Sequence, residues 1–195
     1  RISDPEAALD GRPLRLSSVR VCSPIPHPEQ DIICLGVNYA AHADESAQFD
    51  RKAFLLDRKK ATYFSKRAYQ TSGPDDLIPS YPELVTSLDY EAELAVIIGR
   101  DCKNVCERDA AACIFGYTVL NDVSARNLQT EHNQWYFGKS LDGFTPLGPC
   151  IITEDEVPYP PELAISSTVN GETRQNSNTR YLLHSISEII AELSQ

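Results

Sequence analysis

The sequence predicts a mainly β fold with short helices, in the α+β class, and two observations support this. Short apolar runs rich in Val, Ile, Tyr and Phe recur along the 195 residues, and Gly, Pro, Asn or Asp separates most of them. Stretches with helical periodicity are few and short, so helices do not alternate with strands as they do in a doubly wound sheet. A hydrophobic content of 42% is ordinary for one sizeable domain.

The first predicted elements lie in a small N-terminal segment, residues 1–30, in which prolines interrupt short apolar pieces. A larger domain, residues 31–195, is expected to follow. It begins with a short strand over 32–37, after which Asn38 is expected to cap a helix that starts in YAAHADE. TYFSK, residues 62–66, is a further candidate strand.

The run LDYEAELAVIIG, residues 88–99, is predicted to be a strand that ends at a glycine. Side chains alternate across a strand, so one face carries apolar residues and the other carries Asp89, Glu91 and Glu93. Carboxylates side by side on one face repel each other. The pattern therefore raises the question of what neutralises them.

The remaining elements are predicted to be strands, short helices and loops. A short helix over 107–115 is expected to end at Gly116, and YTVLNDV is a predicted strand. The long segment NLQTEHNQWYFGKSLDGFTPLGP is expected to be a functional loop. CIITEDEV and LAISSTVNGETRQ are predicted strands, the second turning at Asn170–Gly171, and RYLLHSISEIIAEL is a predicted amphipathic helix.

The composition excludes several classes of protein. A net charge of −10 argues against binding to the nucleic-acid backbone. No apolar run approaches the roughly 20 residues needed to span a bilayer, and no signal peptide is visible. The six scattered cysteines fit reduced, buried thiols in a cytoplasmic protein better than a zinc site. The chain contains no methionine and stops in a helical pattern, so we expect the gene product to be longer.

Three acidic residues suggest a metal site. Glu91 and Glu93 lie two apart on one strand face, and Asp122 ends the apolar strand YTVLND. Acidic groups beside apolar residues need a cation, and carboxylate oxygens suit Mg²⁺, Mn²⁺ or Ca²⁺ better than zinc. The alternative is a half-exposed strand face on which charged and apolar residues alternate, and periodicity alone favours that alternative.

Two further features are ambiguous on their own. His42 and Glu45 lie three apart on the predicted helix after LGVN. The carboxylate can orient the imidazole as a general base, or the two can be unrelated residues of an exposed turn. Lys139 lies in the predicted loop, in GKSLDGF, where it can neutralise a substrate carboxylate or a developing enolate.

Taken together, these motifs resemble the fumarylacetoacetate hydrolase family from about Ile32 to the end of the chain. The resemblance rests on LGVNYAAHADE, TYFSK with the following Gly-Pro loop, LDYEAELAVIIG, GYTVLNDVSARNLQ, QWYFGKSLDGFTPLGP and VNGETRQNSNT. Their order and spacing fit the family throughout, and several are long and unusual. The resemblance therefore favours the functional interpretation of the acidic residues and of the His–Glu pair.

The resemblance implies a mixed β-roll of strongly curved sheets that forms a homodimer. The family continues with further strands and a Gly-Thr-Pro segment, so this catalytic domain is expected to lack its C-terminal part. Carried over residue by residue, the family's site falls on metal ligands Glu91, Glu93 and Asp122, on catalytic residues His42, Glu45 and Lys139, and on substrate-contacting residues Arg126 and Gln129.

The implied activity is metal-dependent chemistry on 2-oxo acids. Mg²⁺, with Mn²⁺ or Ca²⁺ as alternatives, would be chelated by the substrate and would stabilise its enolate. We predict C–C cleavage, either hydrolysis of an acylpyruvate or decarboxylation of oxaloacetate. One alternative is an isomerase of 2-hydroxydienedioates from aromatic catabolism, which needs no attacking water and should tolerate loss of the His–Glu pair better. Another is a non-catalytic protein that binds a metal and a ligand on the same fold.

Overall fold

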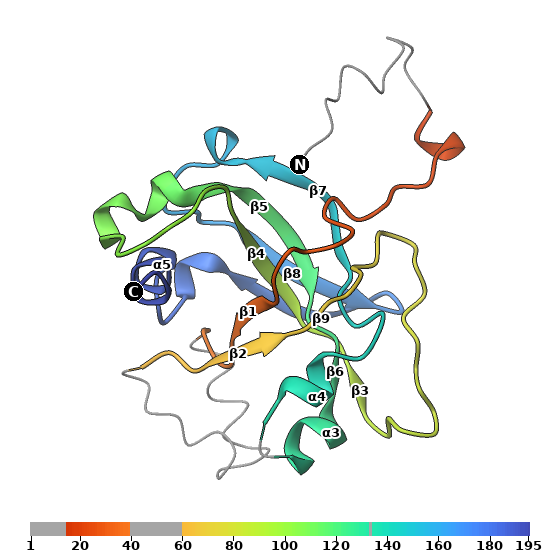
Figure 1. The fold of residues 1–195 in the computed structure, drawn as a ribbon. Coiled ribbons are helices and arrows are strands. Elements are labelled where there is room, and N and C mark those ends of the chain that lie inside the picture. The colour runs from red at the N-terminus through yellow and green to blue at the C-terminus, as the bar shows by residue number, and fades with distance from the viewer. Residues whose placement is uncertain (1–14, 40–59, 133) are drawn as a thin grey trace.

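The structure is a computed structural model that describes residues 15–39, 60–132 and 134–195. Within these ranges the chain forms short strands with a few short helices, which confirms the predicted α+β class (Figure 1). The strands are β1 (Ile32–Leu35), β2 (Tyr63–Lys66), β3 (Leu88–Asp89), β4 (Ala92–Ile98), β5 (Ile114–Asn121), β6 (Ser124–Ala125), β7 (Leu147–Thr153), β8 (Ala164–Val169) and β9 (Glu172–Asn178). The α-helices are α3 (Arg126–Glu131), α4 (Tyr136–Lys139) and α5 (Ile186–Leu193), and the 3₁₀ helices are η1 (Leu16–Ser18), η2 (Glu107–Cys113), η3 (Glu154–Glu156) and η4 (Thr179–Tyr181).

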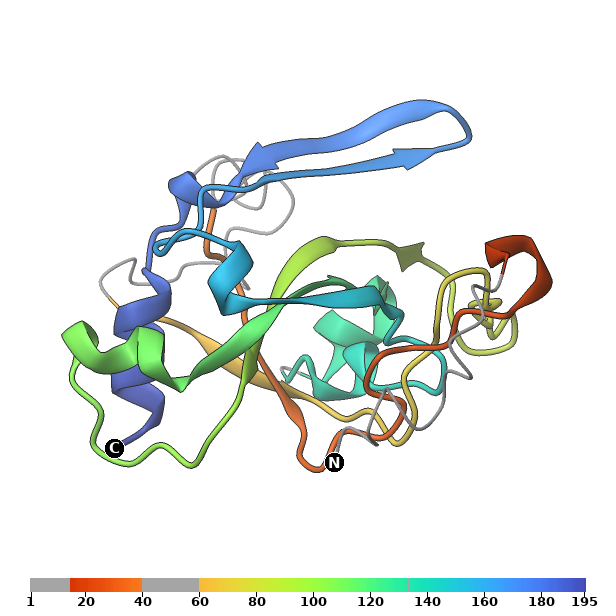
Figure 2. The same ribbon diagram turned by 90° about the horizontal axis from the view of Figure 1, so that it is seen from above.

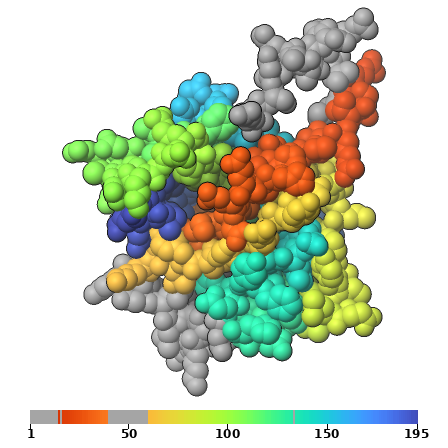
Figure 3. Space-filling model, viewed as in Figure 1, coloured from red at the N-terminus to blue at the C-terminus, as the bar shows by residue number. Residues whose placement is uncertain are grey.

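The described strands pair into small antiparallel sheets: β1 with β2, β3 with β6, β4–β5–β7, and β8 with β9. An isolated bridge between Ser72 and Pro146 is parallel. The β8–β9 hairpin is the long pair of strands along one edge of Figure 2, and it is joined to β4, where the Ala92 N–H donates to Gln175 Oε1 at 2.9 Å. It turns at Asn170 and Gly171, both with positive φ, as the Asn-Gly dipeptide predicts. The segment that leads into β1 lies beside β2 on the face shown in Figure 3.

The predicted strand over 88–99 is divided into two short strands that join different sheets. β3 pairs with β6, whereas β4 pairs with β5. Glu91 lies between them, and its backbone is fixed by the end of β5: the Asp122 N–H donates to Glu91 O at 2.8 Å, and the Glu91 N–H donates to Asn121 Oδ1 at 3.1 Å. The break therefore holds Glu91 beside Asp122.

Two buried clusters form the described core. One joins β5, η2 and α5 and contains Tyr117, Ile186 and Ile190, against which the apolar side chains of β4 pack. The other joins β6, α3 and the segment before β7, and it contains Leu128 and Phe144. Burying these aromatic and aliphatic side chains is the main force that holds the strands around the site.

The helix predicted over 107–115 is wrong in type and in extent. Residues 107–113 form the 3₁₀ helix η2, and the chain is already a strand from Ile114 onward. Gly116 does not end a helix; it lies within β5, where a Cβ would collide with the backbone oxygen of Ile152 in β7. The glycine is needed for close approach of two strands.

The C-terminal helix is shorter than predicted. Ser185 caps α5, since its Oγ accepts from the Glu188 N–H at 3.1 Å while the Glu188 carboxylate accepts from the Ser185 N–H at 2.7 Å. The preceding residues pair with the segment after β1 instead: the His184 N–H donates to Asn38 Oδ1 at 2.8 Å, and Tyr39 forms an antiparallel bridge with Leu182. Tyr39 is therefore extended, and no helix begins at that residue.

Two predictions made from the composition can be compared with the described residues. No helix in the described ranges is long and apolar enough to cross a bilayer. All six cysteines lie within these ranges and are free thiols, as predicted. The prediction that they are buried is wrong for most of them: only Cys113 is buried, whereas Cys22, Cys106 and Cys150 are exposed.

Candidate active site

A buried ammonium group lies between two of the predicted metal ligands. Lys139 Nζ donates to Glu91 Oε2 at 2.7 Å and to Asp122 Oδ2 at 2.8 Å. Burial opposes the charge of Lys139, but the two carboxylates outweigh it and raise the pKa of Lys139 above its ordinary value. The prediction that Lys139 lies in a loop is wrong, because it is the last residue of α4, and this short helix points its side chain at the carboxylates.

A second buried lysine, which the sequence analysis missed, lies on the other side of Asp122. Lys66, at the end of β2, has none of its surface exposed. Its Nζ donates to the carbonyl oxygens of Val123 and Lys139 and lies 2.8 Å from Asp122 Oδ1. Burial lowers the pKa of Lys66 despite the attraction of Asp122.

Asp122 is held as an anion between these two ammonium groups. Burial opposes its charge, but Lys139 and Lys66 together lower the pKa of its carboxyl. Oδ1 accepts no hydrogen bond of regular geometry, although the Lys66 ammonium is in ion-pair contact with it. A buried carboxylate oxygen with this unused acceptor capacity is available to a further cation.

Arg126 completes the cationic side of the cluster. It is the first residue of α3, and its Nη2 lies 2.6 Å from Glu91 Oε1 and 2.7 Å from Asp89 Oδ2. Its Nη1 donates to Gln129 Oε1 at 2.9 Å, so the two predicted substrate-contacting residues are joined to each other. Burial opposes the charge, but Glu91 and Asp89 raise the pKa of Arg126. Asp89 thus forms an ion pair with Arg126, and it is not one of the three predicted metal ligands.

Glu93 faces the same cluster from β4. Burial, and then the nearby charges of Glu91 and Asp122, raise the pKa of its carboxyl to about 8. Glu93 in turn acts with burial to raise the pKa of Tyr39 to about 12. The structure therefore brings all three predicted metal ligands within electrostatic reach of one another.

The donor chemistry of this cluster fits a hard divalent cation. Three carboxylates supply only oxygen atoms, and Asp122 Oδ1 has unused acceptor capacity. Within the described ranges, however, no three His, Cys, Asp or Glu side chains are arranged around a common metal position. Lys139 and Arg126 form ion pairs with the two carboxylate oxygens of Glu91 instead. Positively charged side chains therefore lie where the prediction places a metal ion.

His42 and Glu45 lie outside the described residues, so their predicted pairing stays a prediction. Lys66 and Tyr39 were not among the predicted site residues. The sequence signal for Lys66 is weak: it shares one face of a predicted strand with Phe64, two residues earlier, but the surrounding stretch is rich in charges. Tyr39 had none beyond its place in the LGVNYAAHADE motif.

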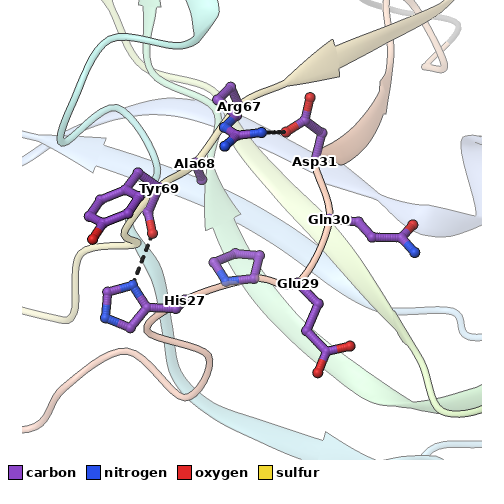
Figure 4. A pocket seen from close by; sticks show the side chains of 8 residues that line it. His27, Glu29, Gln30, Asp31, Arg67, Ala68 and Tyr69 are labelled. Carbon is purple, nitrogen blue, oxygen red and sulfur yellow. Dashed lines mark hydrogen bonds and ion pairs between the residues drawn. The ribbon is translucent and has the colours of Figure 1, made fainter.

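A separate surface pocket of about 290 Å³ lies between the segment before β1 and the segment after β2 (Figure 4). Residues 27–31 and 67–69 line it, and none of the predicted site residues does. An ion pair joins Arg67 to Asp31 with N and O 3.3 Å apart, and the His27 Nδ1–H donates to Tyr69 O at 2.9 Å (Figure 4). The charged groups of this pocket are of both signs, and Arg67 and Asp31 pair with each other. The pocket therefore offers no concentration of one charge that would bind a ligand of the opposite charge.

Residues 31–195 match the family described as fumarylacetoacetate (FAA) hydrolase, C-terminal. Curated relatives include an oxaloacetate tautomerase of Bacillus subtilis (strain 168), 38% identical over 92% of this chain and 58% of the relative. A mitochondrial oxaloacetate tautomerase of Xenopus laevis is 40% identical over 97% of this chain and 58% of the relative. The chain thus spans less than two thirds of the length of these relatives.

Solved structures agree with the sequence match. A fumarylacetoacetate hydrolase from Exiguobacterium antarcticum superposes with a TM-score of 0.75 at 38% identity, covering 89% of this chain and 60% of the other. A maleylpyruvate hydrolase from Sphingobium sp. SYK-6, in complex with manganese(II) and pyruvate, superposes with a TM-score of 0.73 at 34% identity, covering 97% and 63%. The motifs predicted from the sequence, the α+β fold and these likenesses agree, and the chain belongs to the fumarylacetoacetate hydrolase family.

Proposed function

We propose that this chain builds a divalent-metal-dependent active site for 2-oxo acids, and that its reaction passes through the enolate of the substrate. The observation that carries the proposal is the buried cluster in which Lys139 bridges Glu91 and Asp122. The cluster places oxygen ligands for a hard cation beside fixed positive charge, which is what an enolate needs. The manganese and pyruvate bound to the related maleylpyruvate hydrolase support the same assignment.

The residues of this cluster would have separate roles in the reaction. Glu91, Glu93 and Asp122 would hold Mg²⁺ or Mn²⁺, which supplies positive charge to the carboxylate and keto oxygens of the substrate. Lys139 would stabilise the negative charge that develops on the enolate oxygen. Arg126, oriented by its hydrogen bond to Gln129, would bind the second carboxylate of a dicarboxylic substrate through its planar donors.

Among the reactions open to such an enolate, we place keto–enol tautomerisation of oxaloacetate first. Two relatives that match more than nine tenths of this chain are oxaloacetate tautomerases. This changes the emphasis of the sequence-based prediction, which favoured C–C cleavage. Hydrolysis of an acylpyruvate is the second candidate, because the structurally similar maleylpyruvate hydrolase belongs to that class of reaction.

His42 and Glu45 remain our proposed general base pair. Tyr39, three residues before His42, lies close enough to Glu93 for the carboxylate to influence its pKa, so the chain approaches the acidic cluster just before this pair. C–C hydrolysis needs a base that activates water, whereas tautomerisation only moves a proton. We therefore expect His42→Ala to abolish hydrolysis while it leaves Mg²⁺ affinity nearly unchanged.

The decisive experiment compares two substrates after metal removal. The protein is treated with EDTA, then given Mg²⁺ or Mn²⁺, and ultraviolet absorbance follows oxaloacetate enol and acetylpyruvate side by side. Pyruvate formation from oxaloacetate is measured separately with lactate dehydrogenase and NADH. Metal-dependent loss of the enol without pyruvate supports the tautomerase; pyruvate, or loss of acetylpyruvate, supports cleavage.

A matched pair of variants tests the site itself. Glu91→Gln should lose both Mn²⁺ binding, measured by calorimetry, and turnover, because it removes a charged ligand. Glu172→Gln, on the exposed hairpin strand β9, should change neither. Metal binding that survives in Glu91→Gln would overturn the ligand assignment. Binding of metal and pyruvate without turnover of either substrate would favour the non-catalytic alternative.

We also propose a homodimer with a cytoplasmic location, as the family resemblance and the free thiols suggest. Light scattering coupled to size-exclusion chromatography measures the mass directly. A mass of one chain would contradict the dimer.

A further inference from the structure

Two cysteine thiols away from the acidic cluster lie against each other. Cys113 ends η2 and belongs to the buried cluster that joins η2, β5 and α5, with 5% of its surface exposed. Cys102 lies in the connection between β4 and η2 and packs against that same cluster. The Cys113 thiol lies near enough to influence the Cys102 thiol, whose Sγ donates to Arg100 O at 3.2 Å, and both are free thiols.

The backbone holds the two residues opposite each other. Three residues before Cys102, the Gly99 N–H donates to Cys113 O at 2.8 Å. Three residues after Cys102, the Val105 N–H donates to Ser194 Oγ, just after α5, at 2.9 Å. The connection is thus tied down on both sides of Cys102. A disulfide requires two side chains at short range, and both cysteines pack into the same buried cluster.

We propose that Cys102 and Cys113 are a disulfide site: a low-molecular-weight disulfide such as oxidised glutathione oxidises the pair, and the bond joins the β4–η2 connection to the end of η2. The half-buried Cys102 sulfur attacks one sulfur of the glutathione disulfide, whose S–S bond breaks and releases one glutathione thiol. The Cys113 sulfur then attacks the Cys102 sulfur and releases the second. Two electrons pass from the cysteines to the glutathione, and the two thiol protons end on the two glutathione products.

The rate of this reaction should depend steeply on pH. Burial, and then the contact with Cys113, raise the pKa of the Cys102 thiol to about 11. Only the thiolate attacks a disulfide, and its fraction rises about tenfold per pH unit below the pKa. The bond should therefore form slowly at pH 7 and about tenfold faster at pH 8.

Peptide mapping of the oxidised protein tests the proposal without any mutation. Trypsin cleaves after Arg100, Lys103, Arg108 and Arg126, which places each cysteine of this region in its own peptide. We expect non-reduced digests to contain residues 101–103 linked to residues 109–126, with the loss of two hydrogen atoms. A link from residues 104–108, which carry Cys106, or the absence of any link after prolonged incubation at pH 8, would overturn the proposal.

Matched variants give a second readout. The exposed Cys106 is the control, so Cys106→Ser should still form the bond. Cys102→Ser should not form it, and Cys113→Ala should instead retain one glutathione on Cys102. In urea, oxidation should raise the unfolding midpoint of the wild type and of Cys106→Ser but not of Cys102→Ser, because the bond restricts the unfolded chain. An equal rise in Cys102→Ser would contradict the assignment.

Discussion

Replacing Lys66 with methionine should destabilise the protein strongly, although Lys66 was not among the predicted site residues. Methionine fills a similar volume without charge or donors, so Lys66→Met isolates the polar contacts of the ammonium group. In the native protein that group donates to Val123 O and Lys139 O and lies 2.8 Å from Asp122 Oδ1. The substitution leaves two carbonyl oxygens without this donor and removes one of the two cations that flank Asp122.

The size of the effect follows from these three contacts. Removing one partner of a buried ion pair costs about 3–5 kcal/mol, because the remaining charge is left uncompensated. Lys139 still contacts Asp122, which reduces that cost. Each buried carbonyl that loses its donor adds about 1–3 kcal/mol. These costs are partly offset, because the substitution also removes the unfavourable burial of the Lys66 ammonium group, which lowers its pKa. We therefore expect the free energy of unfolding to fall by about 3–5 kcal/mol in metal-free protein.

Urea unfolding at pH 7 in EDTA, followed by the fluorescence of the single tryptophan, Trp135, measures this change. Arg67→Met is the matched control on the next residue. Arg67 is 61% exposed and pairs with Asp31 at the surface, so its loss should cost less than about 1 kcal/mol. If Lys66→Met costs no more than Arg67→Met, with the same denaturant slope, the buried network does not stabilise the fold as argued.

Three further predictions concern elements outside the site. Ser185→Ala should lower the free energy of unfolding by about 1 kcal/mol through loss of the α5 cap, measured by urea unfolding. Phe144→Ala should cost about 3–5 kcal/mol because the ring has no exposed surface, whereas Phe137→Ala, at a ring 41% exposed, should cost far less in the same assay. Hydrogen bonds from Ser185 hold the pKa of Glu188 below its ordinary value of 4.5, so its contribution is full above that pH and is lost as the pH falls through the lowered pKa. Between roughly pH 5 and pH 3, the urea midpoint of Glu188→Gln should therefore fall less than that of the wild type. An equal fall in both proteins would contradict this contribution of Glu188.

The acidic part of the site could be predicted because its residues follow a local pattern. Glu91 and Glu93 alternate with apolar residues, and Asp122 directly follows the apolar strand β5. These are signals that a single segment carries. The fold class could be predicted for the same reason, since short apolar runs and turn residues are local features.

Lys139 and Arg126 were predicted as site residues, but their ion pairs with these carboxylates could not be predicted in the same way. Lys139 meets Glu91 from 48 residues away and Asp122 from 17 residues away, and no local pattern encodes either contact. Lys66 lies in a stretch with many charges, where one buried lysine resembles its exposed neighbours. The division of the 88–99 strand was also unpredictable, because Asn121 and Asp122 of another segment fix the backbone of Glu91.

Lys66 donates to Val123 O and Lys139 O, which lie 57 and 73 residues further along the chain. Closing such long loops costs conformational entropy that no single contact repays, so this cluster cannot assemble in a partly folded chain. Its carboxylates come into register only when the whole topology is complete. The cluster should therefore lose its capacity to bind a ligand in the same transition in which the chain unfolds. A ligand specific for the cluster should also protect strands such as β2 from hydrogen exchange.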